Sequence, residues 1–165
     1  MLTLILLALA APLSPVQKDS DPKDPKAKEG VTIKLDPFIA KLVEPDAKDS
    51  EVVKLQKERA RERAIYVVKT QEVIKIGNWN AAHFGEYAKE QRTLWENLAG
   101  LATKPEDKLK CAEMRLEAAK EFEKFVTSRV NVGSDPSQNQ DFAKAFRLDA
   151  EIDLLKLKEA LKDKK

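Results

Sequence analysis

Few residues of this 165-residue chain could carry chemistry, and they do not form a catalytic set. His83 is the only histidine and Cys111 the only cysteine, and the two fall on different expected helices. A zinc site needs several such ligands, usually two of them closely spaced. We therefore expect His83 to be a capping or surface residue and Cys111 a small buried side chain, with no metal, no cofactor and no catalytic residue.

Three carboxylates interrupt the apolar stretches in the second half of the chain: Glu123, Asp149 and Asp153. Paired carboxylates can perform acid-base catalysis, and inward glutamates with a histidine three residues later can hold two iron ions. The sequence contains no Glu-x-x-His, no glycine-rich phosphate loop and no Gly-x-Ser-x-Gly motif. These carboxylates are therefore expected to set helix register or to face solvent, so the sequence predicts a non-enzymatic protein with no evident small-molecule substrate.

The composition favours long helices. Charged residues make up 35% of the chain, and the predominance of Ala, Leu, Glu, Lys and Arg is typical of helical bundles and coiled coils. The net charge is only +2, and the basic run Lys57–Arg63 also contains glutamates. A basic tail at 163–165 follows a lysine-rich segment, where cations complement the negative end of a helix. We therefore expect no nucleic-acid partner.

The first 30 residues are expected to lie outside the folded domain. Residues 1–11 resemble a signal peptide because they are apolar and end in the small-x-small pattern Ala8-Leu9-Ala10, although they lack a basic start. They are too short to span a bilayer. Residues 12–30 form a Pro-, Lys- and Asp-rich segment typical of a disordered linker. This pattern predicts a periplasmic or secreted protein without a transmembrane span in its mature chain. A start codon placed too far downstream and a simple apolar tail are the alternatives.

Residues 31–44 are expected to form a short strand or helix that leads into the main domain. Val31, Ile33 and Leu35 alternate with polar residues, as in a strand. Asp36-Pro37 is typical of a cap and first turn, so a short helix is expected to run to Val43.

Turn residues divide the next segment, the helical domain at 45–162, into four helices. Pro45 and Asp46 are expected to begin the first. Gly77 and Asn80 suggest a helix end followed by a helix start, although the heptad pattern continues through them and leaves an unbroken helix open.

Two further turns are expected in this domain. Thr103 begins a capping box with a proline in the first turn. At the last turn, Gly133 suits a left-handed helix end, and Asp135 and Pro136 suit an N-cap and a first helical residue. Helices of similar length joined by short turns predict an all-α fold of antiparallel up-down hairpins, forming a four-helix bundle or a coiled coil.

Apolar stripes mark the helix faces. In the first helix the stripe has the seven-residue spacing of Val53, Ala60, Val67 and Ile74, with Val52, Tyr66 and Val73 beside it. The second has the clearest core face: Phe84, Tyr87, Ala88, Gln91, Leu94, Trp95, Leu98, Leu101 and Ala102. The third and fourth each carry two apolar lines, and in the fourth these are Phe142, Ala145, Leu148, Ile152 and Leu155, and Ala143, Phe146, Ala150, Leu154, Leu157 and Leu161. Two apolar sides imply two neighbours.

The run Arg129-Val130-Asn131-Val132-Gly133 precedes a helix with Ala145, Arg147-Leu148, Ala150-Glu151 and Leu154-Leu155. This segment resembles the periplasmic helical hairpin of TolC-type outer-membrane efflux proteins. The resemblance covers some 35 residues and implies hairpin geometry and an extracytoplasmic setting. It does not imply a channel, because the chains of that family are far longer.

These patterns lead to one functional expectation and one alternative. We expect an exported helical structural or interaction module, associated with envelope or efflux-type assemblies, that binds a protein partner or itself through helical faces. The alternative is a periplasmic holdase chaperone that resembles the Skp type, which would use the strand expected at Val31–Leu35.

Overall fold

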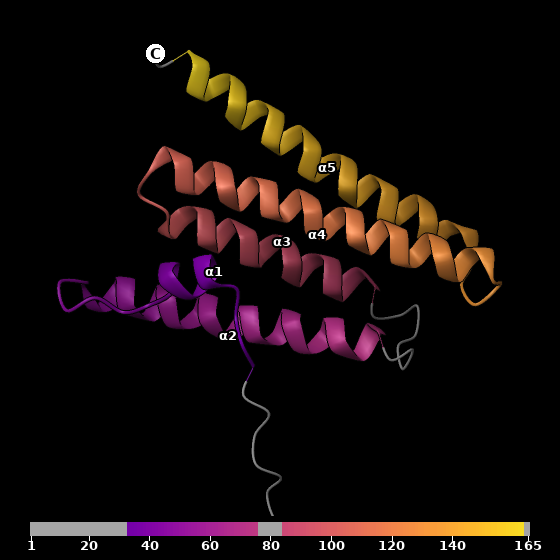
Figure 1. Ribbon diagram of the computed structural model, residues 1–165, viewed down its shortest axis with the longest axis horizontal. Coiled ribbons are helices and arrows are strands. Elements are labelled where there is room, and N and C mark those ends of the chain that lie inside the picture. Colours follow the sequence, from indigo (N-terminus) through magenta and orange to yellow (C-terminus); the bar gives the residue numbers. More distant parts are fainter. Residues whose placement is uncertain (1–32, 76–83, 164–165) are drawn as a thin grey trace, which may run out of the picture. The chain divides into compact units, whose positions relative to one another are not determined.

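The computed structural model describes residues 33–75 and 84–163 (Figure 1). The chain divides into two units, Met1–Thr32 and Ile33–Lys165, and all described residues belong to the second. They form five helices, which are α1 (Pro37–Leu42), α2 (Glu51–Lys75), α3 (Phe84–Leu101), α4 (Pro105–Asn131) and α5 (Ser137–Lys162). The prediction of an all-helical chain is confirmed, and the described residues include no strand. The expected signal segment and linker lie outside the described residues.

Helix α1 begins at Pro37, where the Asp36-Pro37 pattern predicts a helix start. The Asp36 side chain accepts a hydrogen bond from the backbone N–H of Phe38 at 2.8 Å and caps the helix, and Val43 follows its end. The strand expected just before it is wrong at Ile33–Leu35, which have no regular structure, while Val31 lies outside the described residues. A lone strand has no partner for its backbone groups, and Leu35 instead packs against the core.

Helix α2 begins later than Pro45, because a polar turn precedes it. Backbone N–H groups of Asp46 and Lys48 donate to the carboxylates of Asp49 and Asp46, at 2.7 Å and 2.8 Å. The Ser50 hydroxyl then accepts from the N–H of Val53 at 3.3 Å. Short polar side chains satisfy the local backbone in this way before the helix starts at Glu51.

Helices α2 and α3 pack side by side and run in opposite directions. Arg63 pairs with Glu90 at 2.7 Å, and Arg59, one turn earlier, donates to Asn97 at 3.1 Å. An earlier residue of α2 thus contacts a later residue of α3, so the two helices are antiparallel. They are therefore separate helices, and the expected turn residues Gly77 and Asn80 between them lie outside the described residues.

Helix α4 packs against both α3 and α5. The ion pairs that join it to α5 and to the turn before α5 are Glu113 with Lys158, Arg115 with Asp153, Glu123 with Arg147 and Arg129 with Asp135. Later residues of α4 pair with earlier residues of α5 and its preceding turn, so α4 and α5 are also antiparallel. Figure 1 shows the resulting order of helices, with α3 and α4 between α2 and α5.

The turn between α4 and α5 is a Schellman motif. Gly133 has a φ of 72°, its N–H donates to the carbonyl of Val130 at 2.9 Å, and the N–H of Ser134 donates to the carbonyl of Arg129 at 2.8 Å. Glycine suits this left-handed position because it has no Cβ to clash with the backbone.

Two expected side-chain caps are wrong. Pro136, not Asp135, is the N-cap of α5, and Lys104, not Thr103, is the N-cap of α4, and neither makes a side-chain cap hydrogen bond. The Asp135 carboxylate instead accepts from Nε of Arg129 at 2.5 Å. A charged guanidinium binds a carboxylate more strongly than a neutral backbone N–H does.

The core joins all five helices. Phe122 of α4 contacts aromatic rings of both neighbouring helices, with ring centroids 5.6 Å from Phe84, 5.3 Å from Tyr87 and 5.9 Å from Phe146. The predicted core face of α3 is confirmed by the burial of Phe84, Tyr87, Ala88, Gln91, Leu94, Trp95 and Leu98. On α2 the expected stripe is buried at Ala60, Val67 and Ile74, but its expected neighbours Val52, Tyr66 and Val73 are exposed.

None of the helices within 33–75 and 84–163 combines the length and apolarity that a membrane crossing requires.

Candidate interaction surface

The described residues that were candidates for catalysis or metal binding do not form a common site. Cys111 is buried on α4, and burial, together with the negative charge of Asp107, raises the pKa of its thiol to about 11. A thiol with this pKa stays protonated near neutral pH and is a poor nucleophile. His83 lies outside the described residues, and within 33–75 and 84–163 no group of His, Cys, Asp and Glu side chains could hold a metal ion.

The three carboxylates that interrupt the apolar stretches all join helices. Glu123 accepts from Arg147 at 2.7 Å, Asp149 from Arg92 at 2.5 Å and Asp153 from Arg115 at 2.6 Å. Each pair connects two different helices, so these carboxylates add polar contacts between α5 and its neighbours α3 and α4. Sequence reasoning identified the carboxylates but not the arginines, because the pairing depends on which helices are neighbours.

A cleft of about 450 Å³ opens between α1, α2, α3 and α4. Its walls are mainly apolar and include Ile39, Val67 and Met114. Gln91 and Trp95 also line it, and Gln91 Oε1 and Trp95 Nε1 have no hydrogen-bond partner among the described residues. Both atoms are sealed from solvent. A molecule in the cleft could therefore reach them only if side chains moved.

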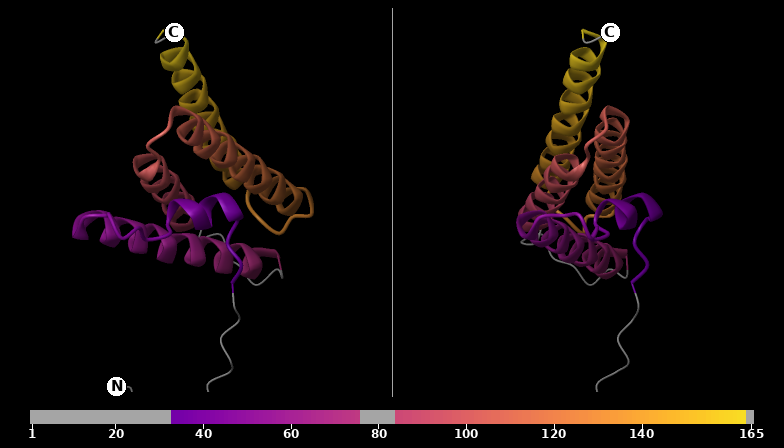
Figure 2. Two further views of the ribbon diagram at one scale, coloured as in Figure 1. Left: turned by 60° about the vertical axis from the view of Figure 1, so that its left-hand side comes forward. Right: turned by 90° about the vertical axis from the view of Figure 1, so that its left-hand side faces the viewer.

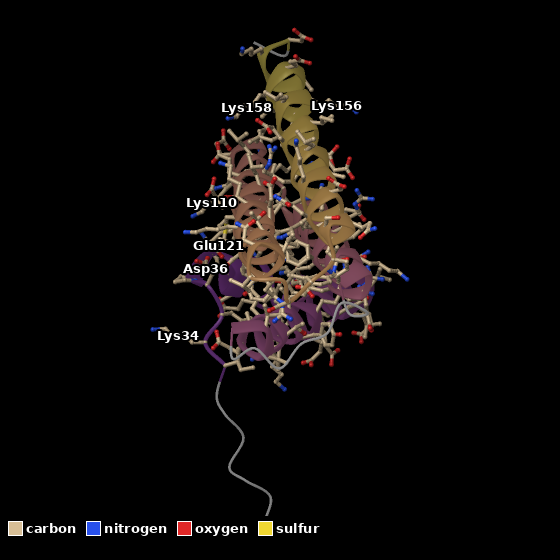
Figure 3. All side chains as sticks on the ribbon, turned by 90° about the vertical axis from the view of Figure 1, so that its right-hand side faces the viewer. Lys34, Asp36, Lys110, Glu121, Lys156 and Lys158 are labelled. Atoms are coloured by element: carbon tan, nitrogen blue, oxygen red, sulfur yellow. The ribbon has the colours of Figure 1, made fainter. Side chains whose placement is uncertain are left out.

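Charged side chains line the outer part of this cleft. Figure 3 shows Asp36, before α1, on the same side as Lys110 and Glu121 of α4, and all three line the cleft. The Lys110 ammonium also lies 4.4 Å from the centre of the Phe38 ring, where the cation is attracted to the aromatic face. The cleft thus has apolar walls and a mixed-charge rim, without a reactive group directed into it.

The predicted turn residues do not form one site. Gly133, Asp135 and Pro136 lie together at the turn before α5. Thr103 is exposed and lies before the other end of α4, a helix of 27 residues. At about 1.5 Å per residue these two ends are about 40 Å apart. The turn residues shape the fold separately and contact no common ligand position.

Helix α5 has two apolar faces, as its sequence predicts. The inner face packs against α4 and buries Ala143, Phe146, Ala150 and Leu154. Opposite to it is the outer face, which we define as Phe142, Ala145, Leu148, Ile152 and Leu155. All five are exposed, and the four large ones keep 41%, 41%, 46% and 54% of their surface accessible in that order.

The position of α5 explains this exposure. It packs mainly on α4, and only the N-terminal half of its outer side approaches α3. There Phe142, Ala145 and Asp149 line a hollow together with Ala88 and Arg92 of α3. In both views of Figure 2 the C-terminal half of α5 (yellow) lies away from α1 and α2. No other described helix covers Leu148, Ile152 and Leu155.

A second set of exposed apolar residues lies on α2, and it is discontinuous. Val52 and Leu55 are one turn apart, but Arg59 and Glu62 follow at the next positions of the same face before Tyr66. On α5, Ala145, Leu148, Ile152 and Leu155 recur at alternating spacings of three and four residues without a charged residue among them. This spacing is that of a coiled-coil seam.

Comparisons of this chain with protein-family models, with curated proteins and with solved structures found no match. They therefore neither support nor oppose the resemblance to TolC-type efflux proteins.

Proposed function

We propose that this protein is a helical interaction module that binds a protein partner, or another copy of itself, through the outer face of α5. The observation that carries the proposal is the continuous exposed seam of Ala145, Leu148, Ile152 and Leu155. Large exposed apolar side chains arranged in a continuous stripe are typical of protein-binding surfaces. No catalytic step is part of this proposal, in keeping with the paired state of the carboxylates and the protonated state of Cys111.

The proposal includes a setting and an architecture. The two antiparallel pairs, α2 with α3 and α4 with α5, support an arrangement of up-down hairpins joined through α3 and α4. The apolar start of the chain and the resemblance around Gly133 support export and association with envelope or efflux-type assemblies. The holdase alternative loses its main argument, because Ile33–Leu35 are not a strand, and we do not propose it.

The proposal can be tested by affinity capture from envelope extracts with the full chain as bait. The variant Leu148→Glu/Ile152→Glu places two charges in the outer face without touching the core. Val52→Glu/Leu55→Glu is the matched control, because it places the same charges among the exposed apolar residues of α2.

The expected result is at least one polypeptide that the wild type and the α2 control retain and the α5 variant loses. The same bound set for all three baits would contradict the proposal. Circular dichroism of each bait checks that helix content is unchanged.

A further inference from the structure

We infer that the outer face of α5 binds the same face of a second copy of this chain, with the two α5 helices parallel. The inference rests on the proposed function and names its partner. Three features of α5 carry it: the residue types in the seam, the charges that flank the seam and the location of the seam on the molecule.

The seam has the residue types of a parallel two-stranded coiled coil. In heptad notation Ala145 and Ile152 occupy the a positions, and Leu148 and Leu155 occupy the d positions. Ile152 at a with leucine at both d positions favours two parallel strands, and the other a position holds the small, unbranched Ala145. The inner residues Ala143, Phe146, Ala150 and Leu154 then occupy b, c and f, so one helix can pack on α4 and on a second copy at the same time.

The charges beside the seam are complementary in the parallel arrangement. There, each g residue faces the e residue five positions later on the other helix. The three facing pairs are Lys144 with Asp149, Glu151 with Lys156, and Lys158 with Asp163. Each pairs a positive with a negative charge, and twofold symmetry makes each pair occur twice.

The antiparallel arrangement has the opposite electrostatics. In the antiparallel register that keeps all four apolar seam residues together, Leu148 faces Ile152 and Ala145 faces Leu155. In this arrangement each e residue faces an e residue of the other helix, and each g residue faces a g residue. Asp149 therefore faces Asp149, Glu151 faces Glu151 and Lys144 faces Lys158. Each of these three contacts is repulsive, while Lys156 faces the uncharged Phe142, and repulsion across a seam disfavours that pairing.

The flanking residues keep accessible surface for these contacts, although Lys158 lies 3.7 Å from Glu113 of α4 and would have to exchange that partner for Asp163. Lys144 and Lys156 are exposed, and Asp149 and Glu151 keep about half of their side-chain surface accessible beside Arg92 and Arg147. Figure 3 shows Lys156 and Lys158 on opposite sides of the C-terminal half of α5, as e and g positions must be. The charged residues Asp141 and Glu159 end the apolar seam on either side. A seam this short predicts a dimer that dissociates on dilution.

The test is sedimentation equilibrium of the full chain over a concentration series, with a charge-swap set. Glu151→Lys places lysine opposite Lys156, and Lys156→Glu places glutamate opposite Glu151, twice in each dimer. Each single variant is expected to dimerise about tenfold more weakly than the wild type, since two charge pairs change from attractive to repulsive. The double variant Glu151→Lys/Lys156→Glu and an equimolar mixture of the two single variants are expected to recover dimerisation.

The recovery separates the inference from a structural effect, because the double variant also lacks the Arg147–Glu151 ion pair. The direction is tested by oxidative cross-linking in a Cys111→Ala background. Parallel helices are expected to cross-link Leu155→Cys with itself. Antiparallel helices would instead cross-link Leu155→Cys with Ala145→Cys, and that result would overturn the inference.

Two other outcomes would also overturn it: a wild type that stays monomeric at all concentrations, or a dimer indifferent to the charge swaps. If the wild type is monomeric while Leu148→Glu/Ile152→Glu still abolishes capture of another protein, the inference fails and the proposed function stands. If that variant changes neither dimerisation nor capture, both fail.

Discussion

At the scale of single residues, Gly133 determines how the chain leaves α4. Its φ of 72° allows two backbone hydrogen bonds to close the helix end, and beyond its chain neighbours a Cβ at this position would meet no atom within 4 Å. Glycine is therefore required because a Cβ is strained against the local backbone at positive φ, and not because another part of the fold lies too close. This requirement could be predicted from the sequence because a glycine after a long apolar-patterned helix is a local signal.

Gly133→Ala is expected to destabilise the protein by about 1 kcal/mol, because alanine is strained at positive φ. Gly100→Ala is the matched control: Gly100 lies inside α3 and a Cβ there also meets nothing within 4 Å. That change is expected to stabilise by roughly 0.5 kcal/mol. Urea unfolding of both variants tests the signs, and stabilisation by Gly133→Ala would exclude the turn.

The pair of Arg129 and Asp135 fixes the same turn from the side. The Asp135 side chain is only 3% exposed, so removing Arg129 leaves a buried charge without its partner. A double-mutant cycle with Arg129→Gln and Asp135→Asn is expected to give a coupling energy of about 1–2 kcal/mol. The exposed pair of Lys120 and Glu117 is the control and should couple by less than about 0.5 kcal/mol. Equal coupling in the two pairs would show that burial of Asp135 contributes nothing.

Burial of Cys111 predicts a pH dependence of stability. The pKa of its thiol is raised from 9.0 to about 11 in the folded protein, so the unfolded chain loses this proton first as pH rises. The favourable contribution is complete below about pH 9 and is lost as pH approaches 11. Unfolding free energies measured between pH 8 and 11 should fall more steeply for the wild type than for Cys111→Ala. Parallel slopes would contradict the raised pKa.

At the scale of helices, α5 shows what periodicity can and cannot predict. Both apolar lines are visible in the sequence because a helix repeats every 3.6 residues. Which line faces α4 depends on how side chains such as Phe146 fit against the residues of α4, including Phe122, and local sequence does not contain that information. The same limit explains why Tyr66 on α2 was expected near the core and is exposed.

The two faces of α5 should respond differently to truncation. Phe146→Ala removes a ring that packs edge-on against Phe122 and should cost about 3 kcal/mol. Leu148→Ala, at the adjacent turn of the outer face, should change the stability of the monomer by less than about 0.5 kcal/mol. Thermal or urea unfolding at low protein concentration measures both. A large cost for Leu148→Ala would mean that the outer face is covered within one chain.

At the scale of the whole molecule, the all-helical class and the core face of α3 follow from composition and spacing. The start of α2 does not, because side chains such as Asp49 and Ser50 accept hydrogen bonds from the backbone N–H groups around it. The pairing of helices was expected only as a general up-down arrangement, since the contacts of Arg92, Arg115 and Arg147 connect segments far apart in the chain. The sequence shows that α5 has a second apolar line, but it does not show which of the two lines is exposed in the folded protein.

The central claim is that the outer face of α5 is the apolar surface that this protein offers to partners. The most direct measurement is the fluorescence of an environment-sensitive apolar dye titrated into the full chain at low concentration. We predict that Leu148→Glu/Ile152→Glu removes most of the dye signal of the wild type while Val52→Glu/Leu55→Glu retains it. Equal dye signals from the wild type and both variants would contradict the claim.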